Sequence, residues 1–126
     1  MKKILLHMCC GPCSCYPVKK LREENFEPVG YFFNPNIHPY QEWRQRLRTA
    51  REFAQKVGIN FFADNHYRLR EYLSKVLSVV DEQDTIEFSD GFHKRCGICY
   101  SWRLSEAAHF AAENNFEIFT STLFYS

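Results

Sequence analysis

The sequence lacks a long hydrophobic run. No apolar stretch among its 126 residues approaches the roughly 20 residues that a membrane-spanning helix needs. The opening Met-Lys-Lys-Ile-Leu-Leu-His is basic, but its apolar run breaks after three residues and is too short for the core of a signal peptide. We therefore expect a cytoplasmic protein with no membrane partner.

A strong net charge and a phosphate-binding loop are also missing. Sixteen Lys and Arg against fifteen Asp and Glu give a net charge of +1, so no global positive field points to nucleic acid. No Gly-x-Gly-x-x-Gly or Gly-Lys-Ser/Thr sequence follows the first predicted strand, and Pro12 removes an amide that a phosphate cradle would use. ATP binding is therefore not implied.

The pattern of apolar residues predicts alternating strands and helices in one domain over residues 1–126. We expect strands at 3–8, 28–33, 59–63 and 116–121, and helices at 14–25, 40–57, 67–77 and 96–114. Gly58 should cap the second helix, and residues 81–94 should form an irregular connection. Crossovers of this length suit parallel pairing, so the order predicts a three-layer α/β fold with an open parallel sheet.

Six cysteines stand out against this background. Four lie within seven residues after the first predicted strand and two form a distant pair: Cys9, Cys10, Cys13 and Cys15, then Cys96 and Cys99. Without an export signal, such clustering favours metal binding or catalysis over structural disulfides. Ligands of open α/β sheets bind beyond the carboxyl ends of the strands, which is where the first group lies.

The residues alone leave three uses of these thiols open. Four thiolates suit an iron–sulfur cubane, and the adjacent Cys9 and Cys10 can serve two of its corners if the turn is tight. A single zinc ion is the first alternative, because Cys96-x-x-Cys99 has the spacing of a zinc knuckle. Cys10-Gly-Pro-Cys13 also spells the thioredoxin redox motif, although no later proline stands where that fold requires one.

The position of the second pair bears on its chemistry. A helix that begins at Cys96 would place this pair at a helix N-terminus, where the helix dipole stabilises thiolate. Both groups of cysteines would then meet at one edge of the sheet.

Three separated motifs cover most of the chain. They are His-x-Cys-Cys-Gly-Pro-Cys at residues 7–13, Phe-Phe-Asn-Pro-Asn-Ile-His-Pro at 32–39 and Arg-Cys-x-x-Cys-Tyr-x-x-Arg-Leu at 95–104. In sequence and order they resemble the cobalamin-independent epoxyqueuosine reductases. The resemblance implies an adenine nucleotide α-hydrolase-like, Rossmann-like fold and the reduction of epoxyqueuosine to queuosine in tRNA.

The resemblance also implies cofactors and partners. A [4Fe-4S] cluster would be held by Cys9, Cys10, Cys96 and Cys99, with an adjacent mononuclear iron for which Cys13 is the candidate ligand. The implied partners are tRNA bearing epoxyqueuosine and an electron donor of ferredoxin or flavodoxin type. Residues 122–126 look like the Thr-Leu-x-x-Ser motif of the family, whose members run on past this point, so we expect a C-terminal portion to be absent from this chain.

Several polar residues are candidates for substrate binding and proton transfer. Asn34, Asn36 and His38 stand beyond the second predicted strand, where they either bind the base or simply form a turn. Arg95 precedes the second cysteine pair and is a candidate for substrate binding or for offsetting the charge of a cluster. Tyr100 is a candidate proton donor or a packing residue.

Two further residues have structural interpretations, and two other functions stay open. His7 should be a structural histidine with satisfied ring nitrogens, and Cys15 a small buried residue. The alternative functions are a thioredoxin-like thiol-disulfide oxidoreductase and a non-catalytic, zinc-stabilised RNA-binding module. The colour of the purified protein separates the metal alternatives, because iron–sulfur clusters absorb visible light and zinc thiolates do not.

Overall fold

The computed structural model describes residues 2–78 and 90–125, and for residues 90–96 it describes the backbone alone. Within this part of the chain, four strands form one sheet in the order β3-β2-β1-β4, and every neighbouring pair is parallel. The strands are β1 (Lys2–His7), β2 (Phe26–Phe32), β3 (Phe61–Ala63) and β4 (Phe119–Ser121). The predicted parallel sheet is confirmed.

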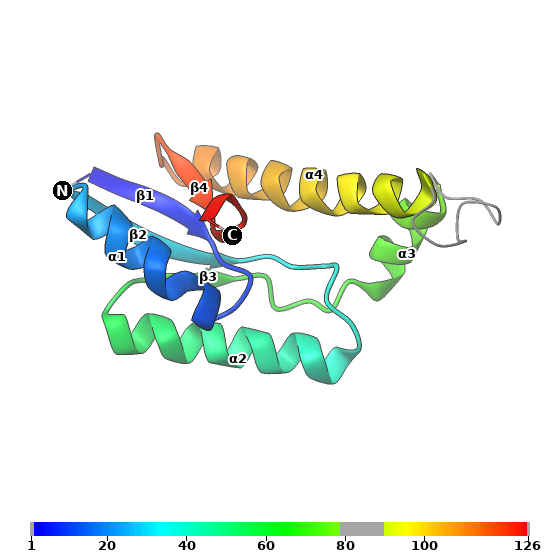
Figure 1. Ribbon diagram of the computed structural model, residues 1–126, viewed down its shortest axis with the longest axis horizontal. Coiled ribbons are helices and arrows are strands. Elements are labelled where there is room, and N and C mark those ends of the chain that lie inside the picture. Colours follow the sequence, from blue (N-terminus) through cyan, green and yellow to red (C-terminus); the bar gives the residue numbers. More distant parts are fainter. Residues whose placement is uncertain (1, 79–89, 126) are drawn as a thin grey trace.

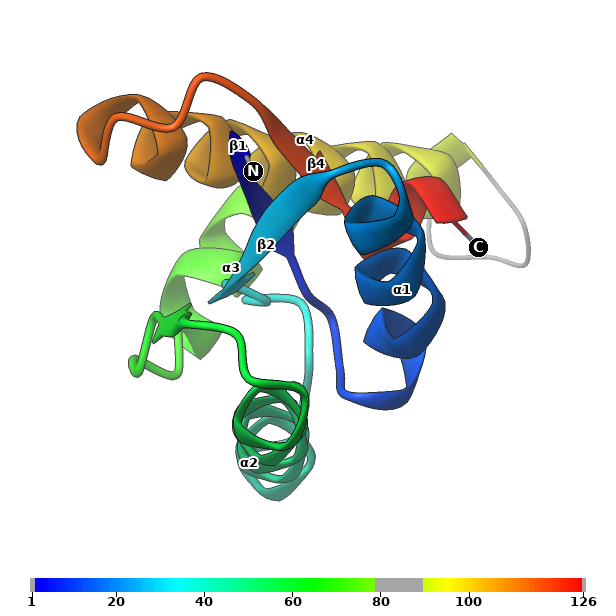
Figure 2. The same ribbon diagram turned by 90° about the vertical axis from the view of Figure 1, so that its left-hand side faces the viewer.

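Both faces of the sheet are covered by helices (Figure 1). Helices α1 (Cys15–Glu23) and α2 (Tyr40–Val57) lie on one face, and α4 (Asp90–Glu113) lies along the other. Helix α3 (Leu69–Leu77) packs against α4, and the turned view in Figure 2 shows the layers end-on. The protein therefore has a three-layer, Rossmann-like α/β fold.

Residues along β1 and β2 alternate between two apolar cores. Ile4, Leu6 and Phe32 pack toward α1 and α2, and the intervening Leu5 and Tyr31 pack toward α4. Strands buried on both faces have nearly continuous apolar sequences, as these two strands do. The dense packing on β1 and β2 makes the carboxyl ends of these strands rigid supports for whatever follows them.

Helix α2 agrees with its prediction to the residue. Its buried side chains recur at helical spacing, namely Trp43, Leu47, Ala50 and Ala54. Gly58 ends the helix in the left-handed conformation at φ 74°, and its N–H donates to the Ala54 carbonyl. This is the αL cap that a glycine after the last apolar residue favours.

Helix α4 begins earlier than predicted. Residues 90–94 were expected in an irregular connection, but they are helical, and Cys96 lies six residues beyond the first residue of the helix. The dipole argument for the second cysteine pair was therefore wrong, because the dipole acts within the first turn. The rest of that predicted connection, residues 81–89, lies outside the described residues. No helix in the described part of the chain is long and apolar enough to cross a membrane.

The order of the strands creates a switch point at β1. The chain passes from β1 to β2 and β3 on one side, and β4 returns to pair with the other side of β1. Connections diverge at such a point, which leaves a crevice beyond the carboxyl ends of the strands. The residues that follow β1 and β4 are therefore brought together although they are more than 100 positions apart.

Gly30 on β2 lies where the packing beside the carboxyl end of β1 leaves no room for a side chain. A Cβ atom at Gly30 would lie 2.6 Å from Met8 Sδ and 3.0 Å from Phe61 Cδ1. Met8 is fully buried, so we expect Gly30→Ala to lower the free energy of unfolding by about 1–3 kcal/mol through overpacking, measured by urea denaturation. Gly97→Ala is the control, because nothing lies within 4 Å of its Cβ position, and we expect it to be neutral or stabilising by up to about 1 kcal/mol. Unchanged stability of Gly30→Ala would contradict the packing of Met8 over this strand.

Candidate metal centre

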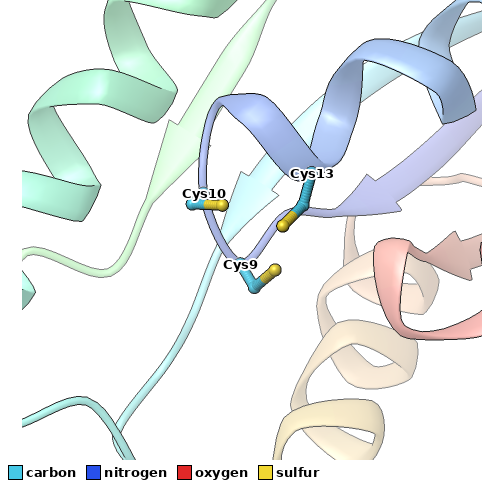
Figure 3. Close-up of side chains that lie close together, drawn as sticks. All are labelled: Cys9, Cys10 and Cys13. Carbon is cyan, nitrogen blue, oxygen red and sulfur yellow. The ribbon is translucent and has the colours of Figure 1, made fainter. Parts of the chain in front are cut away.

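Three thiols meet in the turn that leaves the carboxyl end of β1. The Met8 N–H donates to the Tyr31 carbonyl at 2.8 Å as the last contact with β2, and the chain then turns into the short helix η1 (Pro12–Ser14). The Sγ atoms of Cys9, Cys10 and Cys13 all lie within 4.8 Å of one another. Figure 3 shows the three side chains pointing into a common space.

Side chains from neighbouring elements hold the backbone of this turn. The Asn34 side-chain amide, just past β2, donates to the Met8 carbonyl at 2.9 Å. The Ser14 hydroxyl donates to the Cys10 carbonyl at 2.7 Å. Polar backbone groups of a partly buried turn need such partners, and these bonds fix the direction in which the thiols leave the chain.

Gly11 lets the turn approach helix α2. Its φ of −63° is available to any residue, so conformational freedom is not the reason for a glycine here. A Cβ atom would instead lie 2.9 Å from the Thr49 carbonyl oxygen, a backbone atom that cannot rotate away. The cysteine turn is thereby seated directly against α2.

Thr122, the first residue after β4, contacts Cys9 twice. Its Oγ1 accepts a hydrogen bond from the Cys9 N–H at 3.3 Å and donates to Cys9 Sγ, also at 3.3 Å. Thr122 is almost fully buried, so these bonds are shielded from water. A residue that follows β4 thus directly supports one of the three thiols, which follow β1.

The proximity of the three thiols raises the pKa of one of them. The pKa of Cys13 is raised to about 12, first by its hydrogen bond with the Cys10 side chain, then by desolvation and by Cys9. Three neighbouring thiolates repel one another, so full ionisation requires a compensating cation. The group therefore has the chemistry of a metal site.

A buried imidazole lies beneath the turn. The His7 ring nitrogens contact Ser121 Oγ at 2.9 Å and the Phe33 carbonyl at 2.8 Å. Burial lowers the pKa of His7 to about 4, so the ring is neutral near pH 7. Because a carbonyl only accepts, Nε2 carries the proton and Nδ1 accepts from the Ser121 hydroxyl. The prediction of a satisfied structural histidine is confirmed.

Cys99 lies on the buried side of helix α4. A buried stripe at four-residue spacing runs along the helix, formed by Cys99, Arg103, Ala107 and Ala111. The positive charge of Arg103 contributes to lowering the pKa of His7 at the end of β1. Cys99 lies one helical turn nearer the N-terminus of α4 than Arg103, and it does not belong to the group of three close thiols. The side chain of Cys96 lies outside the described residues.

The predicted substrate-binding residues follow β2. Asn34 is buried, whereas Asn36 and His38 are partly buried. Asn34 Oδ1, Asn36 Oδ1 and His38 Nε2 are buried atoms without a hydrogen-bond partner in the described part of the chain. His38 Nδ1 lies 2.7 Å from the Tyr67 hydroxyl, and burial lowers the pKa of His38. These three atoms can therefore form hydrogen bonds that the loop itself does not supply.

Three other predicted residues have different positions. Tyr100 is 49% exposed, and the Arg103 guanidinium lies 5.0 Å from the centre of its ring. Arg95 lies outside the described side chains. Cys15 was expected to be buried but is exposed at the start of α1, and it does not belong to the group of three close thiols.

Sequence reasoning missed the roles of Thr122 and Arg103. Thr122 belongs to a motif that was noticed, but its contact with Cys9 spans 113 positions and leaves no local pattern. Arg103 belongs to the third motif, but its effect on His7 depends on the packing of α4 and leaves no signal in the sequence. A polar residue directly after a predicted buried strand is the signal that would have identified Thr122.

The spacing of the thiols bears on which metal group they fit. Thiolates on one tetrahedral ion, with bonds of about 2.3 Å, stand about 3.8 Å apart, which is within the observed spread. In a cubane each cysteine binds a different iron atom, so the Sγ atoms of the cysteines stand farther apart than on a single ion. Cys9 and Cys10 are half-buried and Cys13 is exposed, which leaves room for side-chain rotation. Both kinds of centre fit this donor set.

A family model described as "Epoxyqueuosine reductase QueH" matches residues 4–126 of the chain. Among curated proteins, the Epoxyqueuosine reductase QueH of Dehalococcoides mccartyi is 36% identical over 124 residues, covering 98% of this chain and 62% of the relative. Proteins with the same name from Histophilus somni and Haemophilus influenzae are 36% and 34% identical, and each match covers 96% of this chain and 46% of the relative. The chain thus spans about half the length of these curated relatives.

Thr122 provides a test of the support for Cys9. We expect Thr122→Val, which removes both hydrogen bonds without changing the shape of the side chain, to weaken metal binding roughly 10-fold, as is typical of residues that orient metal ligands. The measurement is an anaerobic Co²⁺ titration followed by its thiolate charge-transfer absorption. Thr122→Ser keeps the hydroxyl and should bind like the unaltered chain. Equal affinities for all three proteins would show that Thr122 does not orient Cys9.

Proposed function

Because the chain belongs to the epoxyqueuosine reductase QueH family, we propose that it reduces epoxyqueuosine in tRNA to queuosine. The observation that carries the proposal is the group of three thiols at the carboxyl end of β1, which lies within the matched region. Removing an epoxide oxygen to leave an alkene and water consumes two electrons and two protons. The site must therefore combine a route for electrons with a source of protons.

In this proposal Cys9, Cys10, Cys96 and Cys99 would hold a [4Fe-4S] cluster, and Cys13 would hold an adjacent iron ion. When bound, these groups supply single electrons from the cluster and a Lewis acid from the second iron. Cys13 Sγ lies within 4.8 Å of the Sγ atoms of Cys9 and Cys10, so an iron ion on Cys13 would lie next to a metal group held by the other two.

Residues around the thiols prepare the site for a negatively charged group. Arg103 places a buried positive charge near the end of β1, and Thr122 donates a hydrogen bond to Cys9 Sγ. Hydrogen bonds to sulfur and nearby charges are among the main determinants of the reduction potential of a cluster. Both contacts favour the more reduced, more negative state.

The base of the substrate is held by Asn34, Asn36, His38 and Arg95. Two amide oxygens and one ring nitrogen of this set are buried without a partner in the described part of the chain, and an unpaired buried polar atom costs about 1–3 kcal/mol. A guanine-like base presents N–H donors on its Watson–Crick edge, which enzymes read in a flipped nucleotide. In the neutral tautomer whose Nδ1 donates to the Tyr67 hydroxyl, His38 Nε2 can accept such a bond.

Proton transfer and electron supply complete the proposal. Tyr100 follows Cys99, and its ring is half-exposed beside Arg103, so it has access to both solvent and the second cysteine pair. Its hydroxyl is the proposed proton donor to the departing oxygen. Electrons come from a ferredoxin- or flavodoxin-like partner, which delivers them one at a time.

A zinc-stabilised RNA-binding module is the second candidate. The observation in its favour is the spread of the three Sγ atoms, which suits one tetrahedral ion without any movement. The thioredoxin alternative has less support, because the Cys10-x-x-Cys13 pair shares its space with Cys9 and follows a strand of a sheet whose described strands are all parallel.

Metal analysis separates the two candidates. Protein purified without oxygen should be brown and contain about four sulfides with at least as many irons. Cys10→Ser should remove most of the colour and the sulfide, because Cys10 is a proposed cluster ligand. Cys15→Ser is the matched control and should keep both, because Cys15 lies outside the thiol group. Colourless protein with stoichiometric zinc would exclude the reductase proposal.

An activity measurement tests the separate role of Cys13. With dithionite as chemical reductant, the chain should convert epoxyqueuosine to queuosine in tRNA, followed by mass spectrometry of the digested nucleosides. Cys13→Ser should keep the brown cluster but slow conversion by about 100-fold or more, because a Lewis acid supplies several kcal/mol of stabilisation. Full activity in this variant would mean that Cys13 holds no second metal.

A further inference from the structure

A groove runs between helices α1 and α2, on the face of the sheet opposite α4 (Figures 1 and 2). Two adjoining cavities of about 400 and 530 Å³ form it, and both are lined by Cys15 and Phe53. Val18 and Val57 also line the larger cavity. The middle of the groove is therefore apolar.

One end of the groove reaches the cysteine turn. Gly11 and Pro12 line the smaller cavity, together with Thr49 of α2. These two residues link Cys10 to Cys13, so the backbone that carries two of the three close thiols forms a wall of the groove. None of the described residues of the proposed base-binding set lines it. The groove thus adjoins the proposed metal centre without sharing residues with the substrate-binding loop.

The charged residues of the groove have an excess of positive charge. Three cations and two carboxylates line it, namely Lys19, Arg22, Lys56, Glu23 and Glu52. The Arg22 guanidinium is engaged, because it donates to the Val57 carbonyl at 2.7 Å and lies 3.8 Å from the Glu27 carboxylate. Lys19 and Lys56 are exposed and have no ion pair with any residue that the structure describes. Both ammonium groups can therefore meet a partner.

The surface around the groove adds to this positive charge. Helices α1 and α2 contain eight basic against three acidic residues, a net charge of +5. Because the whole chain has a net charge of +1, the rest of it has a net charge of −4. Arg44 and Arg48 lie in one row with Lys56 along α2, at four-residue spacing. Such an asymmetric field steers an acidic partner toward this layer.

We propose that this groove docks an acidic one-electron carrier protein, of the ferredoxin or flavodoxin class, which supplies the electrons of the reductase reaction. An apolar middle within a charged rim is the usual anatomy of a protein interface, and complexes of redox proteins are among the smallest interfaces. Electron transfer slows steeply with distance, so a carrier must dock close to the thiols. The groove meets this condition through its wall of Gly11 and Pro12.

The inference rests on the proposed function, which consumes two electrons in each reaction. Two reduced carriers dock in turn, and each is oxidised by one electron. Together with two protons, these electrons convert one epoxide to an alkene and water. A carrier that leaves after each electron needs a weak, salt-sensitive interface, as a basic rim around a small apolar groove provides.

Two other occupants suit the groove less well. RNA is bound through its phosphates and through bases that stack on aromatic rings, whereas the middle of this groove is mainly aliphatic and Phe53 is partly buried. A second copy of the chain would bring two positive layers together in a symmetric interface, where like charges repel.

Three carrier proteins test the charge complementarity. The probes are an acidic flavodoxin, an acidic [2Fe-2S] ferredoxin and a basic cytochrome c. Calorimetric titration of the anaerobically purified chain should show roughly micromolar binding of an acidic carrier at about 20 mM salt, weakened about 10-fold at about 200 mM. Cytochrome c should not bind measurably.

Charge reversal locates the docking surface. Lys19→Glu combined with Lys56→Glu should weaken binding of the acidic carrier about 10-fold, because two favourable rim charges become repulsive. Arg70→Glu combined with Lys75→Glu is the matched control: it makes the same change in net charge at exposed positions of α3, and binding should change less than about twofold. Circular dichroism checks that both variants fold like the unaltered chain.

A steric variant tests the apolar middle separately. Cys15 is exposed and lines both cavities, so Cys15→Trp fills the groove without enlarging a core side chain. We expect it to weaken binding of the acidic carrier about 10-fold or more. Cys15→Ser preserves the volume and should bind like the unaltered chain.

Four results would overturn the inference: no binding of either acidic carrier, equal binding of cytochrome c, equal losses in the two charge-reversed variants, or unchanged binding in Cys15→Trp. An anticodon stem-loop RNA that loses more affinity than the carriers in the Lys19 and Lys56 variant would assign the groove to RNA instead. The reductase function is judged separately, by sulfide content and by conversion with dithionite, which needs no carrier protein. A chain that converts epoxyqueuosine but binds neither acidic carrier keeps the function and loses the docking site. A colourless chain that binds them does the reverse.

Discussion

One buried imidazole connects the strand ends on which the candidate site depends. His7 ends β1, hydrogen-bonds Ser121 at the end of β4 and donates to the carbonyl of Phe33, just past β2. The next residues along the three strands support the site: Cys9 follows β1, Asn34 follows β2 and Thr122 follows β4. Burial lowers the pKa of His7, so the ring is neutral near pH 7 and its Nδ1 accepts from the Ser121 hydroxyl.

The fold was predictable where local patterns are strong. Apolar runs and helical spacing identified all four strands and the four helices, and Gly58 marked the end of α2. The start of α4 was not predictable, because residues 90–95, Asp-Gly-Phe-His-Lys-Arg, contain one apolar side chain and no helical period. These residues are helical as part of the longer helix α4, so Cys96 does not lie at the helix terminus.

The site was predictable as a location and less so as a set of contacts. The strand-end rule placed Cys9, Cys10 and Cys13 at the carboxyl edge, where the structure groups them. Cys15 was placed wrongly because general burial statistics for cysteine ignore which side of a particular helix faces the core. The Thr122 contact required knowledge that β4 returns beside β1, a topological fact that no short window of sequence contains.

Adjacent residues at the end of β2 serve the two faces of the sheet. The Phe33 ring packs in the core beneath α4 and meets the Trp102 ring edge-on at 5.7 Å, and the Asn34 amide reaches the Met8 carbonyl in the cysteine turn. One short segment therefore ties the packing of α4 to the backbone of the turn that carries the thiols.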